Sequence, residues 1–201
     1  MASRNRGKAK LRDLSRLHPA SVDVTALIEA FGEMEHPIAT AILGAMLIEY
    51  DLERLLRSRL KHKDDKTWAM LVGENGPLNS FSSKIVMGYA SGIYDKGMHS
   101  NLNIVRNIRN AFAHSKKLIQ FDYPAVVQEL RKATRSALPK ARWKSNDAKG
   151  CYAILCLRLS SKLTQIHARR MKRGLTSRQQ RFERKVREAN LLLAGLAEIK
   201  R

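Results

Sequence analysis

Apolar residues recur at intervals of three and four along most of the chain, and this spacing limits the possible folds more than any other feature. An α-helix places positions spaced in this way on one face, whereas a half-buried strand needs strict alternation. Between residues 38 and 60 the inward positions are Ile38, Ile42, Ala45, Met46, Leu52, Leu55, Leu56 and Leu60. The sequence therefore predicts an all-α protein, a multi-helix bundle core with this long helix as its spine.

Similar spacing and helix-start signals predict the remaining helices. Pro37 suits the first turn of the long helix, and Ser80 or Asn79 can cap a helix that runs to Ile93. The inward set of that helix is Phe81, Ile85, Val86 and Tyr89. Further helical patterns cover residues 24–31, 98–113, a stretch from 123, 151–171 and 177–199.

The excess of positive charge lies at the two ends of the chain. Residues 1–16 carry a net charge of +5, residues 17–130 carry −1, and residues 131–201 carry +16. We expect a basic flexible arm over 1–20, a helical core over 21–138 and a basic C-terminal pair of helices over 150–201. Segregated positive charge favours binding to a nucleic acid, because each neutralised phosphate releases counterions. A solvated charged helix and a loose tail are the alternative.

The C-terminal segment is the strongest candidate for this contact. Its basic residues are Arg169, Arg170, Lys172, Arg173, Arg178, Arg181, Arg184 and Lys185. Phe182 is the only aromatic residue near them, so we do not expect base stacking. We expect contacts with the phosphate backbone instead. An amphipathic basic helix on an anionic membrane is the less favoured reading.

Several other classes of protein are not expected from this sequence. No run approaches the about 20 apolar residues of a membrane helix, and Asp13 and His18 interrupt the start where a signal peptide would be apolar. Cys151 and Cys156 are five apart on a predicted helix, so we expect free buried thiols. We find no metal-ligand spacing and no nucleotide-binding loop. The expectation is a cytoplasmic protein without a metal or cofactor.

The segment from Ile104 to His114 carries the residues best suited to chemistry. Asn110 and His114 share a helix face, Arg109 lies next to Asn110, and Arg106 lies one turn earlier. An arginine fork can hold a phosphate, and histidine can move protons near neutral pH, so together they suffice for metal-independent RNA cleavage. A buried polar network that holds this helix to its neighbours is the alternative.

Two other groups of residues could support this segment. Glu49 on the long helix is the preferred ion-pair partner for Arg106 or Arg109, although it could be an ordinary surface charge. A cluster of turn residues precedes the helix that starts near residue 80. It comprises Gly73, Gly76, Pro77, Ser80 and Phe81, and it is expected to be a structural loop with a helix cap or, alternatively, a loop that binds a partner or an anion.

Two resemblances to known families rest on these segments. Arg109-Asn110 followed by His114 resembles the signature of HEPN-domain ribonucleases, which are four-helix proteins that often act as dimers. The run from Gly73 to Ile85, with Tyr89-Ala90, Gly92, the segment to His114 and Phe121, resembles the mannitol operon repressor family over about residues 20–130. Both resemblances place the Arg-Asn to His segment at the end of a helix.

Three functions follow as hypotheses. The resemblance to the mannitol operon repressor family implies a negative regulator of transcription, or of another nucleic-acid-linked process, and nothing in the sequence resembles a helix-turn-helix reader. The resemblance to HEPN domains implies instead a metal-independent ribonuclease in which Arg109, Asn110 and His114 are catalytic. A scaffold that binds another protein is the third hypothesis. In each case we expect a homodimer and no membrane partner.

Overall fold

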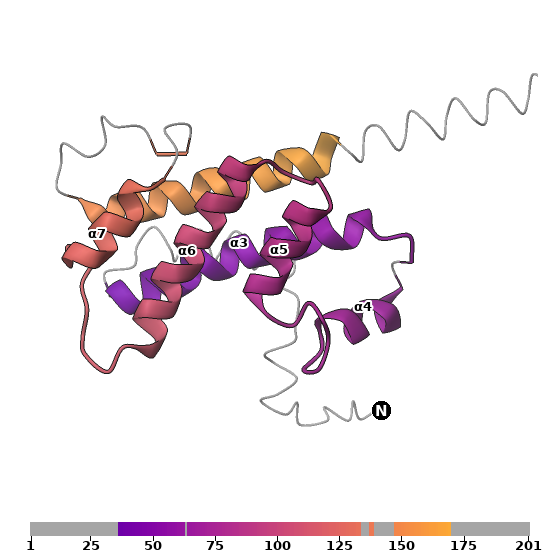
Figure 1. Ribbon diagram of the computed structural model, residues 1–201, viewed down its shortest axis with the longest axis horizontal. Coiled ribbons are helices and arrows are strands. Elements are labelled where there is room, and N and C mark those ends of the chain that lie inside the picture. The colour runs from indigo at the N-terminus through magenta and orange to yellow at the C-terminus, as the bar shows by residue number, and fades with distance from the viewer. Residues whose placement is uncertain (1–35, 63, 134–136, 139–146, 170–201) are drawn as a thin grey trace, which may run out of the picture.

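The computed structural model describes residues 36–62, 64–133, 137–138 and 147–169, and these contain helices and no strand. The helices are α3 (Pro37–Arg59), α4 (Asp65–Val72), α5 (Phe81–Ala90), α6 (Lys96–His114) and α7 (Pro124–Arg131). A further helix occupies residues 148–169. The predicted all-α, multi-helix architecture is confirmed (Figure 1).

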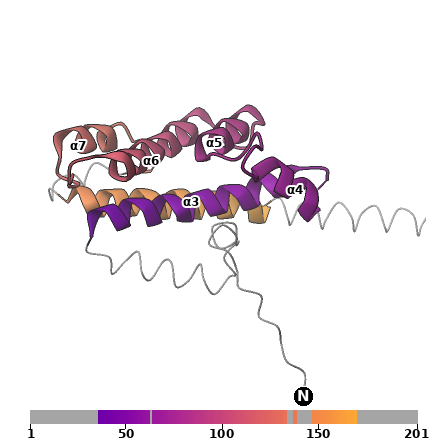
Figure 2. The same cartoon turned by 90° about the horizontal axis from the view of Figure 1, so that it is seen from below.

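The helices form two layers around one apolar core. In Figure 2, α3 and the 148–169 helix run side by side in one layer, and α5, α6 and α7 form the other. Side chains from both layers are almost completely buried between them, including Leu52, Leu55, Ile85, Leu102, Ile108, Tyr152, Leu155 and Leu159. The first part of the basic C-terminal segment thus shares the core, while the domain boundaries themselves stay a prediction.

The long helix begins and ends where the sequence signals indicate. Pro37 is at its first turn, and the chain becomes extended at Leu60. Small side chains let its neighbour approach closely: the Tyr152 hydroxyl of the 148–169 helix donates a 2.7 Å hydrogen bond to the Ala41 carbonyl. Met46 was expected on the inward face, but 49% of it is exposed, so that assignment was wrong.

A compact turn joins α4 to α5. Asp64 caps α4 by accepting from the Thr67 amide. Gly76 packs directly against the end of that helix, where a Cβ atom would lie 2.2 Å from the Leu71 carbonyl oxygen. Ser80 then caps α5 in a reciprocal capping box with Ser83. The turn residues therefore have a sufficient structural explanation.

The α5 helix is rotated relative to the face expected from its apolar residues. Phe81 and Ile85 are buried as predicted, whereas 55% of Val86 and 42% of Tyr89 are exposed. Lys84 takes an inward position instead and is only 4% exposed. The inward face of α5 thus includes the charged Lys84, because acidic residues of α3 pair with its ammonium group.

Aromatic packing ties α6 to the segment before α7 and to the other layer. The ring centroids of Phe112 and Phe121 are 4.7 Å apart, and those of Phe121 and Tyr152 are 5.2 Å apart. Cys151 and Cys156 are both buried and form no disulfide, as expected. None of the described helices combines the length and apolar character required to cross a lipid bilayer.

Candidate functional site

The end of α6 presents two arginines and a histidine in different surroundings. Val105, Ile108 and Phe112 anchor the helix in the core, which leaves the positions between them at its sides. Arg106, Arg109 and Asn110 are partly buried there, and His114 is exposed in the last turn. The Arg109 Nη1 atom donates a 3.0 Å hydrogen bond to the Asn110 side-chain oxygen.

A buried cluster of charges lies beside Arg109, between α3, α5 and α6. The Lys84 ammonium group donates to Glu49 Oε1 at 2.5 Å and also pairs with Glu53. The second oxygen of Glu49 lies 3.9 Å from Arg109 Nη2. Glu49 thus lies between the interior lysine and Arg109 at the edge of the site, and its charge attracts the Arg109 guanidinium group.

Electrostatics keep Lys84 charged inside the protein. Desolvation alone would lower its pKa, but the charges and hydrogen bonds of Glu49 and Glu53 outweigh this effect and raise the pKa above 10.5. Lys84 is therefore a cation at every physiological pH. Because one lysine cannot neutralise two carboxylates, Glu49 can also attract the positive charge of Arg109.

Arg106 belongs to a separate polar chain. Its Nη1 atom donates to the Ser82 hydroxyl at 2.7 Å, and its Nη2 atom donates to the Asn107 side-chain oxygen at 2.9 Å. Asn107 in turn donates to Glu129 on α7. Of the two arginines considered as partners of Glu49, the structure therefore places Arg109, and not Arg106, next to it.

His114 takes no part in either network. Among the described residues its side chain forms no hydrogen bond and no ion pair, and it faces solvent. An exposed imidazole at the end of a helix that also carries a held arginine can meet a phosphate-containing ligand. The ring is four residues beyond Asn110, which places both on one side of α6.

Another acid of α3 lies buried between the two long helices. Asp51 is 5% exposed and accepts a 2.5 Å hydrogen bond from the Ser160 hydroxyl. Burial raises the pKa of Asp51 above 3.8, against the opposing effects of Ser160, Arg54 and Thr164. Its burial depends on a helix more than a hundred residues away, so local sequence patterns carry no signal for it.

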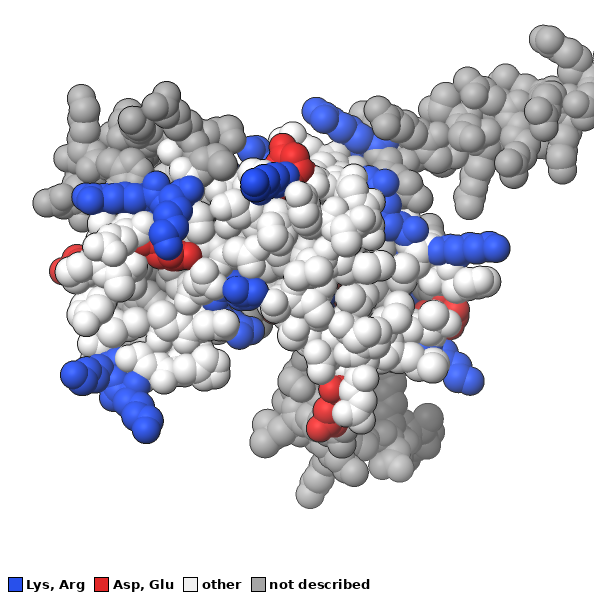
Figure 3. Space-filling model, viewed as in Figure 1, with Lys and Arg blue, Asp and Glu red and all other residues white. Residues whose placement is uncertain are grey.

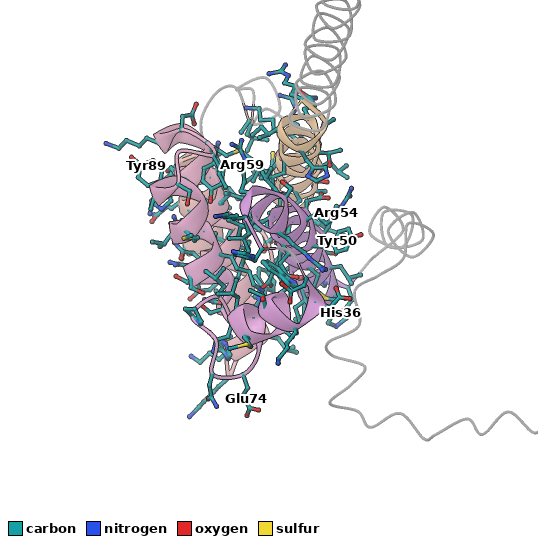
Figure 4. The ribbon with its side chains drawn as sticks, turned by 90° about the vertical axis from the view of Figure 1, so that its right-hand side faces the viewer. His36, Tyr50, Arg54, Arg59, Glu74 and Tyr89 are labelled. Carbon is teal, nitrogen blue, oxygen red and sulfur yellow. The ribbon has the colours of Figure 1, made fainter. Side chains whose placement is uncertain are left out.

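The side of α3 that faces away from α5 carries polar and aromatic side chains. Figure 4 shows Tyr50 and Arg54 projecting from α3 on the side away from α5, and the Arg54 guanidinium carbon lies 5.6 Å from the centre of the Tyr50 ring. On the opposite edge, Tyr89 of α5 stacks on His99 of α6 with ring centroids 4.5 Å apart. His99 is therefore engaged in packing.

The basic C-terminal candidates fall almost entirely outside the described residues. Arg169 is exposed at the end of the 148–169 helix, and the seven other candidates lie beyond it, outside the described part of the chain. In Figure 3, Lys and Arg side chains are spread over the visible face and do not form one stripe. Within the described ranges, no three His, Cys, Asp or Glu side chains are arranged to hold a metal ion.

Comparisons with known proteins extend the structural findings. No model of a known protein family matches the sequence, and no curated protein matches it. Among solved structures, a possible transcriptional regulator, YggD, from Shigella flexneri is similar at 15% identity, with a TM-score of 0.53, over 71% of this chain and 97% of that one. MtlR in the MtlR–HPr complex from Escherichia coli is similar at 13% identity, with a TM-score of 0.55, over 72% of this chain and 98% of that one.

The shared feature is the fold. Both neighbours match along almost their whole length, whereas more than a quarter of this chain lies outside each match. The resemblance to the mannitol operon repressor family is thus supported as a likeness of helical architecture.

Proposed function

We propose that this chain is a regulator of the mannitol-repressor type, acting in repression of transcription or in another nucleic-acid-linked process through its basic ends. The observation that carries the proposal is the segregation of charge: a stretch of net charge −1 lies between ends of +5 and +16. The structural likeness to a possible transcriptional regulator and to MtlR supports the same class. The proposed contact is electrostatic and largely independent of base sequence.

The salt dependence of binding tests this proposal. Fluorescence anisotropy would follow the full chain on labelled duplex DNA and on RNA across a series of salt concentrations. One variant replaces Arg170, Lys172, Arg173 and Arg178 by Gln. Its matched control replaces four exposed lysines of the core by Gln, namely Lys61, Lys66, Lys116 and Lys117.

The two variants should differ clearly. We expect log affinity to fall linearly with log salt, and the C-terminal variant to reduce the slope on duplex DNA by about 3 to 4, because each lost phosphate contact removes about 0.9. The control variant should leave the slope nearly unchanged. Equal slopes for the two variants, or no binding at low salt, would overturn the proposal.

A metal-independent ribonuclease is the second candidate function, and the exposure of His114 favours it. In this mechanism His114 takes the proton from a ribose 2′-hydroxyl, whose oxygen attacks phosphorus while the 5′-oxygen leaves and takes a proton from water. Arg109, held by Glu49 and Asn110, stabilises the charge on the phosphorane. The products are a 2′,3′-cyclic phosphate and a 5′-hydroxyl end.

Cleavage assays in the presence of a chelator separate this candidate from the first. His114→Gln and Arg109→Lys should each abolish cutting without a change in melting temperature, whereas His62→Gln, at another exposed histidine, should cut normally. Full activity of His114→Gln would exclude the catalytic role. Loss of activity that follows loss of folding would make His114 a structural residue.

A protein-binding scaffold is the third candidate. MtlR is seen in a complex with HPr, and α5, which follows the Gly73–Phe81 turn in the sequence, exposes the apolar side chains of Val86, Met87 and Tyr89. We further expect the chain to be a homodimer, which light scattering of the full chain would test. Replacing Val86 and Tyr89 by Ser should abolish partner capture if α5 is the contact surface, with Leu118→Ser, at an exposed position after α6, as the control.

A further inference from the structure

A cavity opens where the start of α6 meets the end of the 148–169 helix. Its volume is about 350 Å³, within the range of small-molecule sites. One wall comes from the turn into α6 and includes Tyr94, Asp95, Gly97 and Asn101, and the other comes from the last turns of the 148–169 helix. These two segments approach each other at the upper right of Figure 1.

The helical wall is basic. Lys162 and Arg169 both line the cavity, with the amide of Gln165 between them. Residues 162, 165 and 169 lie on one side of a helix, so their polar ends can converge on one ligand. Neither cation forms an ion pair with a carboxylate of the described residues, although Asp95 lines the same cavity. Both therefore have charge to offer to an anion.

The opposite wall supplies both a donor and an acceptor. Gly97 lies in the first turn of α6, where backbone N–H groups have no partner within the helix. The Asp95 Oδ1 atom caps this turn by accepting from the Met98 amide at 2.7 Å. Its carboxylate repels a second anion but can accept hydrogen bonds from hydroxyl groups. The wall thus favours a ligand that carries hydroxyls as well as an anionic group.

We propose that this cavity binds a small organic phosphate that carries hydroxyl groups. Lys162 and Arg169 hold the phosphate, Gln165 and the Gly97 amide donate to it, and Asp95 accepts from a hydroxyl of the ligand. An arginine fork matches phosphate geometry in two hydrogen bonds, and lysine adds a point charge. Because Arg169 is also the first of the basic C-terminal candidates for nucleic-acid contact, a ligand here would occupy the start of that segment.

Calorimetry on the full chain tests the site, with ribose 5-phosphate as the probe and ribose and inorganic phosphate as comparisons. We expect one ribose 5-phosphate per chain, weaker binding of inorganic phosphate and none of ribose. Lys162→Gln and Arg169→Gln should each weaken binding roughly tenfold, the effect of one lost charge-assisted hydrogen bond. Arg158→Gln, on an exposed residue of the same helix outside the cavity, should leave it unchanged.

Three results would overturn the proposal. The first is the absence of saturable binding of ribose 5-phosphate up to about 10 mM, a limit that corresponds to very weak affinity. The second is an equal effect of Lys162→Gln and Arg158→Gln, which would indicate general attraction to a basic chain. The third is that duplex DNA displaces ribose 5-phosphate and that Lys162→Gln weakens the binding of DNA as much as that of ribose 5-phosphate. This result would make the cavity a contact for the polymer. Failure here leaves the salt dependence of nucleic-acid binding untouched, so the two proposals fail separately.

Discussion

Replacing Lys84 by Met tests the charge cluster that supports the candidate site. The change removes a cation that contacts both Glu49 and Glu53 while it keeps the length of the side chain. The side chains of Lys84, Glu49 and Glu53 are 5%, 20% and 15% exposed, so the two largely buried carboxylates would lose the ammonium group that both contact. Breaking a buried pair in this way costs about 3 to 5 kcal/mol.

The lower end of this range is the better estimate here. Glu49 keeps Arg109 at 3.9 Å, and both carboxylates keep some contact with solvent. We therefore expect Lys84→Met to lower the free energy of unfolding by about 3 kcal/mol, a large part of the about 5 to 15 kcal/mol of a typical domain. Urea unfolding at pH 7, with an unchanged m-value, is the assay.

Two further variants make the reasoning falsifiable. Lys96→Met, at an exposed lysine, should change the free energy of unfolding by less than about 0.5 kcal/mol. Adding Glu49→Gln and Glu53→Gln to Lys84→Met should recover part of the loss, because neutral amides cost less to bury than carboxylates that have lost this cation. If Lys84→Met is as stable as the unaltered chain, the reasoning that the charge cluster stabilises the fold is refuted.

Three other changes probe the packing. Asp51→Asn should raise the free energy of unfolding at pH 7, because burial raises the pKa of this carboxyl and makes its ionised form costly in the fold; the gain should disappear below pH 3.8, where Asp51 is protonated both folded and unfolded. Tyr152→Phe should lower the free energy of unfolding in urea by about 1 kcal/mol, because the hydrogen bond to the Ala41 carbonyl is lost. An unchanged free energy of unfolding would contradict this contact between the two long helices. Gly88→Ala should lower the melting temperature, since the new Cβ would lie 2.5 Å from the Tyr94 hydroxyl, which is itself held by the Ile85 carbonyl; an unchanged melting temperature would contradict that contact.

The sequence predicted α3, α5 and α6 because their signals are local, whereas α4 was not predicted as a helix. Pro37 and Ser80 mark where α3 and α5 begin, and the apolar spacing from Leu102 to Phe112 follows the inward face of α6. Such signals depend on neighbours within one or two turns, so no knowledge of the rest of the fold is required.

The sequence did not predict which polar residues are buried. Lys84 is on the inward face of α5 only because Glu49 and Glu53 meet it from α3, and Asp51 is buried only because Ser160 reaches it from the 148–169 helix. Apolar spacing likewise misplaced Val86, which is apolar but faces outward. Pairing of this kind depends on contacts between distant segments, and periodicity carries no information about them.

The candidate site was predictable in its residues and only partly in its connections. Arg109, Asn110 and His114 follow from their spacing on one helix, and Glu49 was chosen as a partner by its place on the spine. The lysine that joins Glu49 to the interior was not foreseen, since a lone Lys in an apolar pattern is normally a surface residue.

Photo-crosslinking of the full chain to nucleic acid, followed by mass spectrometry of the crosslinked peptides, tests the central claim most directly. If the positive ends hold a phosphate polymer, the crosslinks should lie within residues 1–16 and 131–201 and should fade as salt is raised. Crosslinks concentrated between residues 37 and 130, or none at low salt, would contradict it.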